Sequence, residues 1–285
     1  MPEVGELAQW ACVAEVTAPK PGNVSVHASF DDLTWKDFIV SAMVIRPVLN
    51  RASELGVGAT VLECARATKE AVRSNTNLGI VLLLAPLCAA PIVEVSSVLD
   101  SLEHSDADAV YEAIRLAQPG GMGEVDAGDV ADAPSIGLVE AMKLAADRDG
   151  VARQYANGFD DVIKVIAPAL VKRYADGESL DHAIVWAHMD QMAREPDSLI
   201  RRKCGDDVAT ESSRRARAVI DADWPNTLES VELYRELDEW LREDGHRRNP
   251  GTSADLVTAG LFVALRDGAI EWPALWSGSL QLAGE

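Results

Sequence analysis

A lysine held between two prolines is the first feature of this sequence that could do chemistry. Lys20 is flanked by Pro19 and Pro21, and Gly22 follows. Proline fixes φ and glycine reaches conformations closed to other residues, so this turn restricts where its lysine can point. A pre-ordered ammonium group suits a phosphate, which makes Lys20 a candidate phosphate ligand. An ordinary surface turn with a solvated lysine explains the pattern at least as well.

Two consecutive aspartates follow in the same loop. Asp31 and Asp32 stand just before a predicted helix that begins at Trp35. Mg²⁺ binds through one or two carboxylates together with phosphate oxygens, so this pair beside a phosphate-binding lysine would complete a magnesium triphosphate site. Acidic residues near a helix start are also common because they interact favourably with the helix dipole. Taken alone, the two aspartates favour that structural role.

Three polar residues precede the most apolar segment of the chain. Asn75, Thr76 and Asn77 stand directly before residues 78–90. The first N–H groups of a helix have no partner within the helix, and they form a natural cradle for an anion or another polar ligand. Capping by Thr76 or Asn77 accounts for one polar residue but not for three. We therefore predict a ligand site at the entry of this helix.

Two further polar segments lie toward the carboxyl end. Arg202 and Lys203 belong to a dense basic cluster in a chain whose formal net charge is −20, and such a patch suits an anionic group. Asp197, in the same segment, could pair with Arg201 on one helical face. Residues 249–255 form a tight turn into another helix, with Asp255 in its first turn. A structural cap and a binding role explain that turn equally well.

The elements that must position these residues are helices. Apolar residues recur at helical spacing and strict alternation is nearly absent, so we predict an all-α fold. Segment 78–90 is apolar on every side, which predicts a central helix enclosed by the others. Thr34, Asp106, Ser135 and Ser253 are predicted N-caps. The predicted helices span residues 4–17, 35–52, 57–73, 78–90, 94–103, 106–117, 135–146, 147–156, 159–173, 179–194, 197–220, 225–243, 253–267 and 271–278.

Composition supports one compact domain over residues 1–285. The chain is 48% hydrophobic with 5% aromatic residues, enough for a substantial core, and no Pro- or Gly-rich linker divides it. A net charge of −20 would repel nucleic acid and anionic membranes, so neither is an expected partner. An acidic surface with far more arginine than lysine suggests a protein that works in high salt, a halophilic trait. The sequence is compatible with an oligomer.

Cysteines and the N-terminus indicate the compartment. Cys12, Cys64, Cys88 and Cys204 lie far apart without a CxxC pair, so free buried thiols are expected rather than a metal site or disulfide. The first ten residues lack the basic start and apolar core of a signal peptide. The longest apolar run, 80–92, is shorter than the roughly 20 residues of a bilayer span. We therefore expect a cytoplasmic protein.

Taken in order, the polar motifs resemble those of the triphosphoribosyl-dephospho-CoA synthase family. The resemblance covers the chain from about residue 10 to residue 268. Its specificity comes from the order of the motifs rather than from any one of them. The motifs are Lys20-Pro21-Gly22-Asn23, Phe30-Asp31-Asp32 with Phe38, Asn75-Thr76-Asn77-Leu78-Gly79, Asp197 with Arg202-Lys203-Cys204-Gly205, and Asn249-Pro250-Gly251 with Ala254-Asp255-Leu256.

The resemblance implies an all-helical enzyme that transfers the triphosphoribosyl part of ATP to the ribose 2'-hydroxyl of dephospho-CoA and releases adenine. ATP would be a substrate and Mg²⁺ a cofactor. Asp31 or Asp32 would bind Mg²⁺, or Asp32 would steady positive charge at the ribose C1, and Asp197 would be the base or a second metal ligand. The residues implied to bind the nucleotide and its phosphates are Lys20, Asn23, Asn75, Thr76, Asn77, Gly79, Arg202, Lys203 and Asp255.

One motif departs from the family pattern. Members associated with citrate lyase usually have Asn-Thr-His at the helix entry, whereas this chain has Asn77 at the third position. An amide cannot exchange a proton near neutral pH. Two alternatives follow: a related pentosyl transfer or N-glycoside hydrolysis with a different acceptor, or a helical protein that binds nucleotide without turnover.

Overall fold

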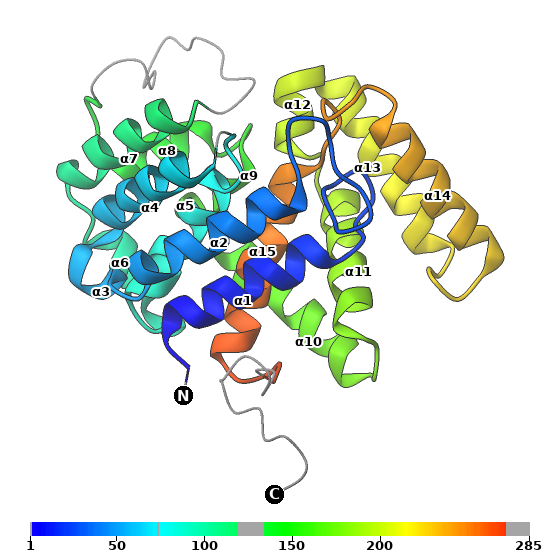
Figure 1. Cartoon of the computed structure of the whole chain (residues 1–285), viewed down its shortest axis with the longest axis horizontal. Helices are drawn as coiled ribbons and strands as arrows, with labels where there is room; N and C mark the ends of the chain where they lie inside the picture. Colours follow the sequence, from blue (N-terminus) through cyan, green and yellow to red (C-terminus); the bar gives the residue numbers. More distant parts are fainter. Residues whose placement is uncertain (1, 73, 119–133, 272–285) are drawn as a thin grey trace, which may run out of the picture.

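The computed structural model describes residues 2–72, 74–118 and 134–271. Within these ranges the chain is helical, and the only β-type pairings are two isolated bridges in the loop after the first helix, Ser25 with Ala28 and Phe30 with Leu33. The predicted all-α fold is therefore confirmed (Figure 1). The predicted helix 271–278 and most of the loop 118–134 lie outside the described residues.

Helix bounds agree with the sequence pattern for most elements. The α-helices are α1 (Val4–Thr17), α2 (Trp35–Leu49), α3 (Ala52–Leu55), α4 (Val57–Ala71), α5 (Leu78–Ala89), α6 (Val95–Asp100), α7 (His104–Ala117), α8 (Leu138–Ala145), α9 (Gly150–Asn157), α10 (Ala167–Ala175), α11 (Leu180–Arg194), α12 (Ser198–Cys204), α13 (Asp206–Asp221), α14 (Leu228–Arg242) and α15 (Gly251–Arg266). A short 3₁₀ turn, η1 (Ile92–Glu94), precedes α6, and a π-helical segment, η2 (Asp161–Ile166), precedes α10.

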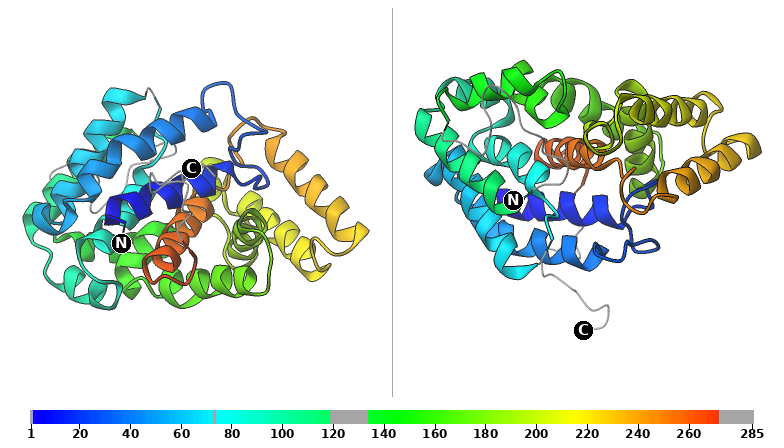
Figure 2. Two further views of the ribbon diagram at one scale, coloured as in Figure 1. Left: turned by 60° about the horizontal axis from the view of Figure 1, so that its bottom comes forward. Right: turned by 90° about the horizontal axis from the view of Figure 1, so that it is seen from above.

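Two helices share the centre of the molecule. The prediction of an enclosed apolar helix is confirmed in α5, where Leu83, Leu84 and Leu87 have no exposed surface. Helix α15 is buried in the same way and contacts α1, α5, α10 and α11 (Figure 2). Burying each leucine side chain contributes about 1.5–3 kcal/mol, so these two helices hold the surrounding layer in place.

Helix starts show which predicted caps are correct. Thr34 caps α2 as predicted, because its N–H and hydroxyl each donate to Asp37 Oδ2 at 2.8 Å. Asp106 does not cap α7. It is the third residue of that helix, and its carboxylate accepts from the N–H of Glu103, the true cap, at 2.9 Å. Asp106 is therefore the third-position acid of a capping box and not the N-cap that the sequence predicts.

The other two predicted caps are also wrong. Helix α8 begins at Leu138 after Gly137, so Ser135 lies outside it. Helix α15 begins at Gly251, which places Ser253 inside the first turn. The N–H and hydroxyl of Ser253 both donate to Asp197 Oδ2, at 2.7 and 2.8 Å. A residue from another helix therefore satisfies this helix start, which local sequence does not reveal.

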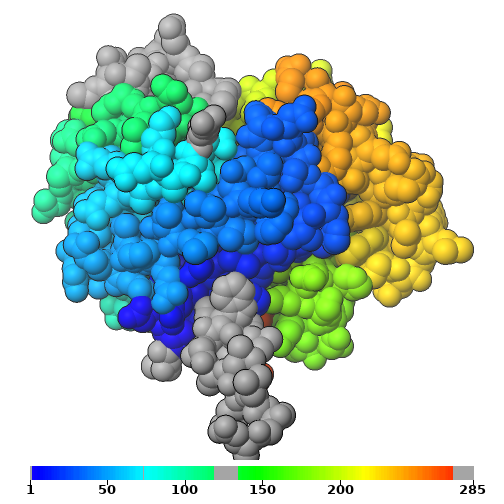
Figure 3. All heavy atoms as spheres, in the orientation of Figure 1, coloured from blue at the N-terminus to red at the C-terminus, as the bar shows by residue number. Residues whose placement is uncertain are grey.

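One predicted helix is divided. The segment 197–220 forms α12 and α13, separated at Gly205, whose φ of 90° is incompatible with a continuous α-helix. Arg202 and Lys203, two basic residues of this segment, lie in the last turn of the short α12. Helices α13 and α14 extend to one side of the molecule, where the segment before α2 lies against α14 (Figure 3).

Among the described residues, no single helix has both the length and the apolar composition to cross a bilayer. Helix α5 and the segment Ile92–Asp100 meet that test only as a pair, across a bend of 98°.

The packing of α5 in the core leads to a testable prediction about stability. Leu83→Ala is expected to lower the free energy of unfolding by about 2–5 kcal/mol, because it leaves a cavity between the two central helices. Val93→Ala is the matched control, since Val93 is 91% exposed and its loss is expected to change stability by less than about 0.5 kcal/mol. Urea denaturation measures both, and equal effects would contradict the central position of α5.

Candidate functional site

A cavity of about 560 Å³ opens where the N-terminal ends of α5, α12 and α15 approach one another. Its polar lining comes from segments far apart in the sequence, and its other walls are apolar side chains of α5, α7, α8 and α9. The predicted site residues that line it are Asn23, Asp32, Asn75, Thr76, Asn77, Gly79, Arg202, Lys203 and Asp255. The tertiary structure thus brings most of the predicted site together.

The three polar residues before α5 have different roles. Asn75 Oδ1 accepts from the Leu78 N–H at 3.2 Å and so caps the helix, and the Thr76 hydroxyl lies 2.6 Å from that of Ser41 on α2. Asn77 makes no capping bond. Its side-chain Nδ2 is buried, lines the cavity and has no hydrogen-bond partner in the described chain. A buried amide without a partner is costly, so Asn77 is a strong candidate to donate to a ligand.

Asp255 faces the same helix entry from α15. A Cβ added at Gly79 would lie 2.0 Å from Asp255 Oδ2, so the carboxylate packs directly against the α5 backbone and glycine is required there. Burial raises the pKa of Asp255, and the carboxylates of Glu15, Asp197 and Asp149 raise it further. Within the described ranges no side chain forms an ion pair with Asp255. It is a carboxylate suited to accept a proton.

Basic residues gather on the wall formed by α12. Arg202 pairs with Asp149, whose other oxygen caps α9 by accepting from Val151 N at 2.9 Å. Arg202 Nε is buried and has no partner in the part of the chain described. Burial and the neighbouring Arg202 lower the pKa of Lys203, which lines the cavity beside it. These donors suit phosphate oxygens.

Asp32 lies at the cavity edge near this basic wall. Its Oδ2 is 3.5 Å from His246 Nε2, and its side chain is 67% exposed. Asp31 is exposed and does not line the cavity, so its predicted metal role is not supported by position. No group of three or more His, Cys, Asp or Glu side chains in the described residues is arranged to hold a metal ion.

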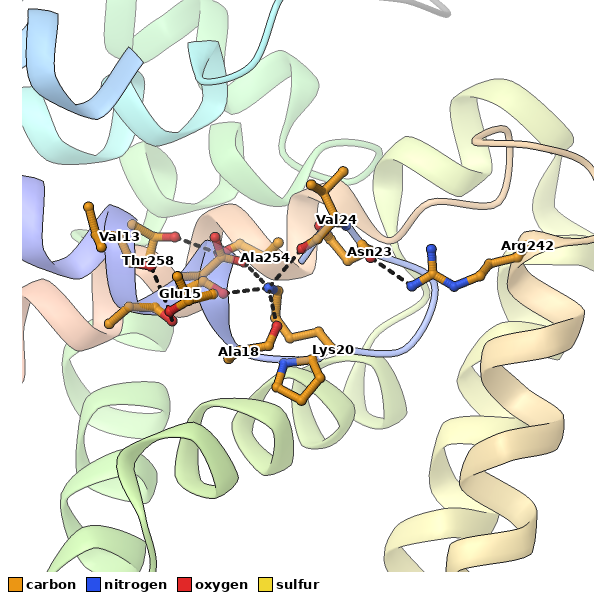
Figure 4. Close-up of polar contacts among 12 residues, drawn as sticks. Val13, Glu15, Ala18, Lys20, Asn23, Val24, Arg242, Ala254 and Thr258 are labelled. Atoms are coloured by element: carbon orange, nitrogen blue, oxygen red, sulfur yellow. Dashed lines mark hydrogen bonds and ion pairs between the residues drawn. The ribbon is translucent and has the colours of Figure 1, made fainter. Parts of the chain in front are cut away.

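The prediction for Lys20 is wrong in its geometry. Lys20 is 1% exposed and does not line the cavity. Its ammonium donates to the carbonyls of Glu15, Ala18 and Val24 and lies 3.1 Å from Glu15 Oε1 (Figure 4). The prolines do hold the lysine, but they turn it into the protein. A phosphate cannot reach it.

Asp197 is also placed differently from the prediction. One carboxylate oxygen caps α12 by accepting from Leu199 N at 2.9 Å and Ile200 N at 3.1 Å, and the other accepts both bonds from Ser253. Both oxygens are occupied, and Asp197 lies outside the lining of the large cavity. It joins α12 to α15 and is not positioned as a catalytic base or a metal ligand.

Several lining residues were not among the predicted ones. Asn249 is 6% exposed and its Oδ1 has no partner among the described residues, which marks it as a second ligand-facing amide. Glu15 is 3% exposed, and its only sequence signal was an acid among the apolar residues at the end of α1. The remaining additions are Arg148, Asp149 and His246. Charged and amide groups without obvious structural partners were the signal that could have identified them.

Comparisons with known proteins identify the family of the chain. The sequence matches the model of the ATP:dephospho-CoA triphosphoribosyl transferase family over residues 1–273. It is similar to a solved structure from Archaeoglobus fulgidus that carries the provisional description triphosphoribosyl-dephospho-CoA synthase. The two are 26% identical with a TM-score of 0.62, over 81% of this chain and 99% of the other. No curated protein matches the sequence at a significant level.

The buried ion pair of Lys20 with Glu15 leads to a testable prediction about stability. Lys20→Met is expected to lower the free energy of unfolding by about 3–5 kcal/mol, because it leaves Glu15 buried without its cation. Burial already raises the pKa of Glu15, and losing Lys20 raises it further. The folded protein then binds a proton that the unfolded chain releases above a pKa of about 4.3, so the loss of stability is larger at pH 8 than at pH 5.

The control is Lys36→Met, which removes an exposed lysine from α2. Urea denaturation at both pH values measures the difference. A Lys20→Met protein as stable as wild type at pH 8 would contradict the buried ion pair.

Proposed function

The chain belongs to the ATP:dephospho-CoA triphosphoribosyl transferase family, and from this premise we propose that its cavity of about 560 Å³ is the active site. The protein is a transferase that passes the triphosphoribosyl group of ATP to dephospho-CoA. The observation that carries the assignment of the site is the meeting of the Asn77, Arg202 and Asp255 segments at one cavity. Among the described residues, Asn77 Nδ2 and Arg202 Nε have no hydrogen-bond partner.

The α12 wall binds the triphosphate in this proposal. Arg202 and Lys203 bring positive charge to the cavity, and His246 adds a third polar group at the edge. The free Nε of Arg202 supplies a directed donor, which a flexible surface lysine would not. The support is the concentration of cationic groups at one end of a cavity in a chain with a net charge of −20.

Asp32 fits a Mg²⁺ ion that accompanies the triphosphate. Mg²⁺ uses one or two carboxylates and completes its shell with phosphate oxygens and water, so an exposed carboxylate beside the phosphate wall is sufficient. When bound, the ion would offset negative charge on the phosphate oxygens. Asp32 would hold the ion, and Arg202 and Lys203 would hold the phosphate oxygens.

Asp255 accepts the proton of the attacking hydroxyl. Asn77 cannot take up a proton, so the base must come from elsewhere in the cavity. Asp255 lies against the same helix entry, lacks a cation partner in the described chain and has a pKa raised by burial. Asn77 and Asn249 orient the ribose through their unpaired amide atoms. Adenine is the leaving group.

The reaction gives a direct test. Purified protein with ATP, Mg²⁺ and dephospho-CoA is expected to release adenine and to form triphosphoribosyl-dephospho-CoA in equal amounts, as measured by chromatography and mass spectrometry. Asp255→Asn is expected to lower kcat by about 10²–10⁴-fold, because the amide cannot accept the proton. Asp267→Asn, at the other end of α15, is the matched control and keeps full activity.

Three results would count against this proposal. No adenine with ATP and dephospho-CoA would reject the transfer itself. Adenine released at the same rate without dephospho-CoA would indicate hydrolysis. Wild-type activity in Asp255→Asn would remove that residue from the mechanism while leaving the reaction intact.

The metal assignment is tested separately. Asp32→Asn is expected to raise the Mg²⁺ concentration for half-maximal activity by about tenfold, equivalent to about 1.4 kcal/mol, because it removes a carboxylate beside the phosphates. Asp31→Asn serves as control, since that side chain lies off the cavity. Titration of activity with Mg²⁺ at fixed ATP measures both. Equal responses of the two variants would reject Asp32 as a ligand.

A further inference from the structure

Glu15 is a buried carboxylate at the closed end of the cavity, and the mechanism above does not use it. It lies near the C-terminal end of α1, is 3% exposed and lines the cavity. Apart from the ammonium of Lys20, no hydrogen-bond donor of the described chain reaches its Oε1. A buried carboxylate is costly unless its charge and its lone pairs are both satisfied, so this open acceptor indicates a ligand.

Lys20 supplies the charge and is the donor nearest to Oε1. An ammonium group has three N–H donors, and here the carbonyls of Glu15, Ala18 and Val24 accept from it. Its Nζ still lies 3.1 Å from Glu15 Oε1 (Figure 4). Lys20 therefore favours the ionised form of Glu15, and a second lone pair of Oε1 stays available to a ligand.

The surroundings of this pair contain few other charges. Asp255 on α15 and the Cys12 thiol on α1 are the titratable groups that act on or near Glu15. Arg242 on α14, Asp181 on α11 and His188 on α11 face Lys20. Burial lowers the pKa of His188 to about 3, so that ring is neutral near pH 7. Lys20 is thus the cation that sets the charge of Glu15.

We propose that Glu15 is a catalytic carboxylate that faces the ribose C1 of ATP and stabilises the positive charge formed there, and that Lys20 is the positioning residue that keeps it ionised. This inference rests on the proposed function. Two neighbouring carboxylates then have two roles. Burial raises the pKa of both, but Lys20 pairs with Glu15 only and opposes that rise, so Glu15 is the more readily ionised of the two and Asp255 exchanges the proton.

The step balances without a further reactant. The bond between C1 and the adenine nitrogen breaks, and its electron pair leaves with adenine. The 2'-hydroxyl oxygen of dephospho-CoA donates the pair that forms the new bond to C1 and loses its proton to Asp255. Adenine takes up one proton as it leaves, which equals the proton the hydroxyl released.

The decisive variant is Glu15→Gln. It keeps the size of the side chain and removes the charge, so kcat is expected to fall by about 10²-fold or more, while KM for ATP changes by less than about threefold. Glu15→Asp keeps the charge at a greater distance, and its kcat is expected to lie between the kcat of the wild type and that of Glu15→Gln. Glu6→Gln on the same helix, where Glu6 pairs with Arg46, is the matched control and keeps wild-type kcat. Thermal melts confirm that each variant is folded.

The pH dependence of kcat tests the role of Lys20. Without the cation the pKa of Glu15 rises, so Lys20→Met is expected to move the acidic limb of the profile to higher pH by about one unit or more. The double variant with Glu15→Gln is expected to lose that shift, because the titrating group is gone. These profiles are measured on the folded fraction at low temperature. If Lys20→Met does not fold, the comparison of kcat between Glu15→Asp and Glu15→Gln still decides the question.

Two outcomes would overturn the inference. An active wild-type enzyme with Glu15→Gln within threefold of its kcat would reject Glu15 and leave the transferase function standing. A wild-type protein that forms no product would reject the proposed function and this inference with it.

Discussion

The buried ion pair between Glu15 and Lys20 is the interaction on which the site depends. It joins the end of α1 to the loop that follows, because the lysine also binds the carbonyls of Ala18 and Val24. The same loop is held from outside by α14, where Asp238 accepts from Gly22 N at 2.7 Å. One wall of the cavity is therefore fixed by a charge pair that is almost fully buried.

Helix ends supply most of the remaining site. Asn77 and Gly79 begin α5, Arg202 belongs to the short α12, and Asp255 follows the first turn of α15. Helix N-termini offer unpaired N–H groups and a favourable field for phosphate, and the buried axes of α5 and α15 hold them rigidly. Asp197 ties two of these ends together by capping α12 and binding Ser253 of α15. Asp197, which the sequence predicts to be catalytic, thus has a structural role: it holds two of the helix ends that form the site.

The charge at the cavity differs from the net charge of the molecule. A chain with a net charge of −20 would repel a nucleotide triphosphate, yet Arg202 and Lys203 face the cavity beside Asp149, which offsets only part of their charge. Glu15 and Asp255 line the same cavity, and in the proposed mechanism they lie where a positive charge develops at the ribose. The local arrangement of charge, rather than the net charge, therefore decides which ligand the cavity accepts.

The sequence by itself determined the helical fold, the enclosed position of α5 and the motif order, since periodicity, apolar content and residue spacing are local properties. Only the tertiary structure decided the direction of each side chain. Lys20 turns inward because Glu15 and three carbonyls satisfy it, α12 separates from α13 at Gly205, and Asp255 meets Gly79 across helices far apart in sequence. Burial and pairing of a charge depend on such distant neighbours, and local spacing does not encode them.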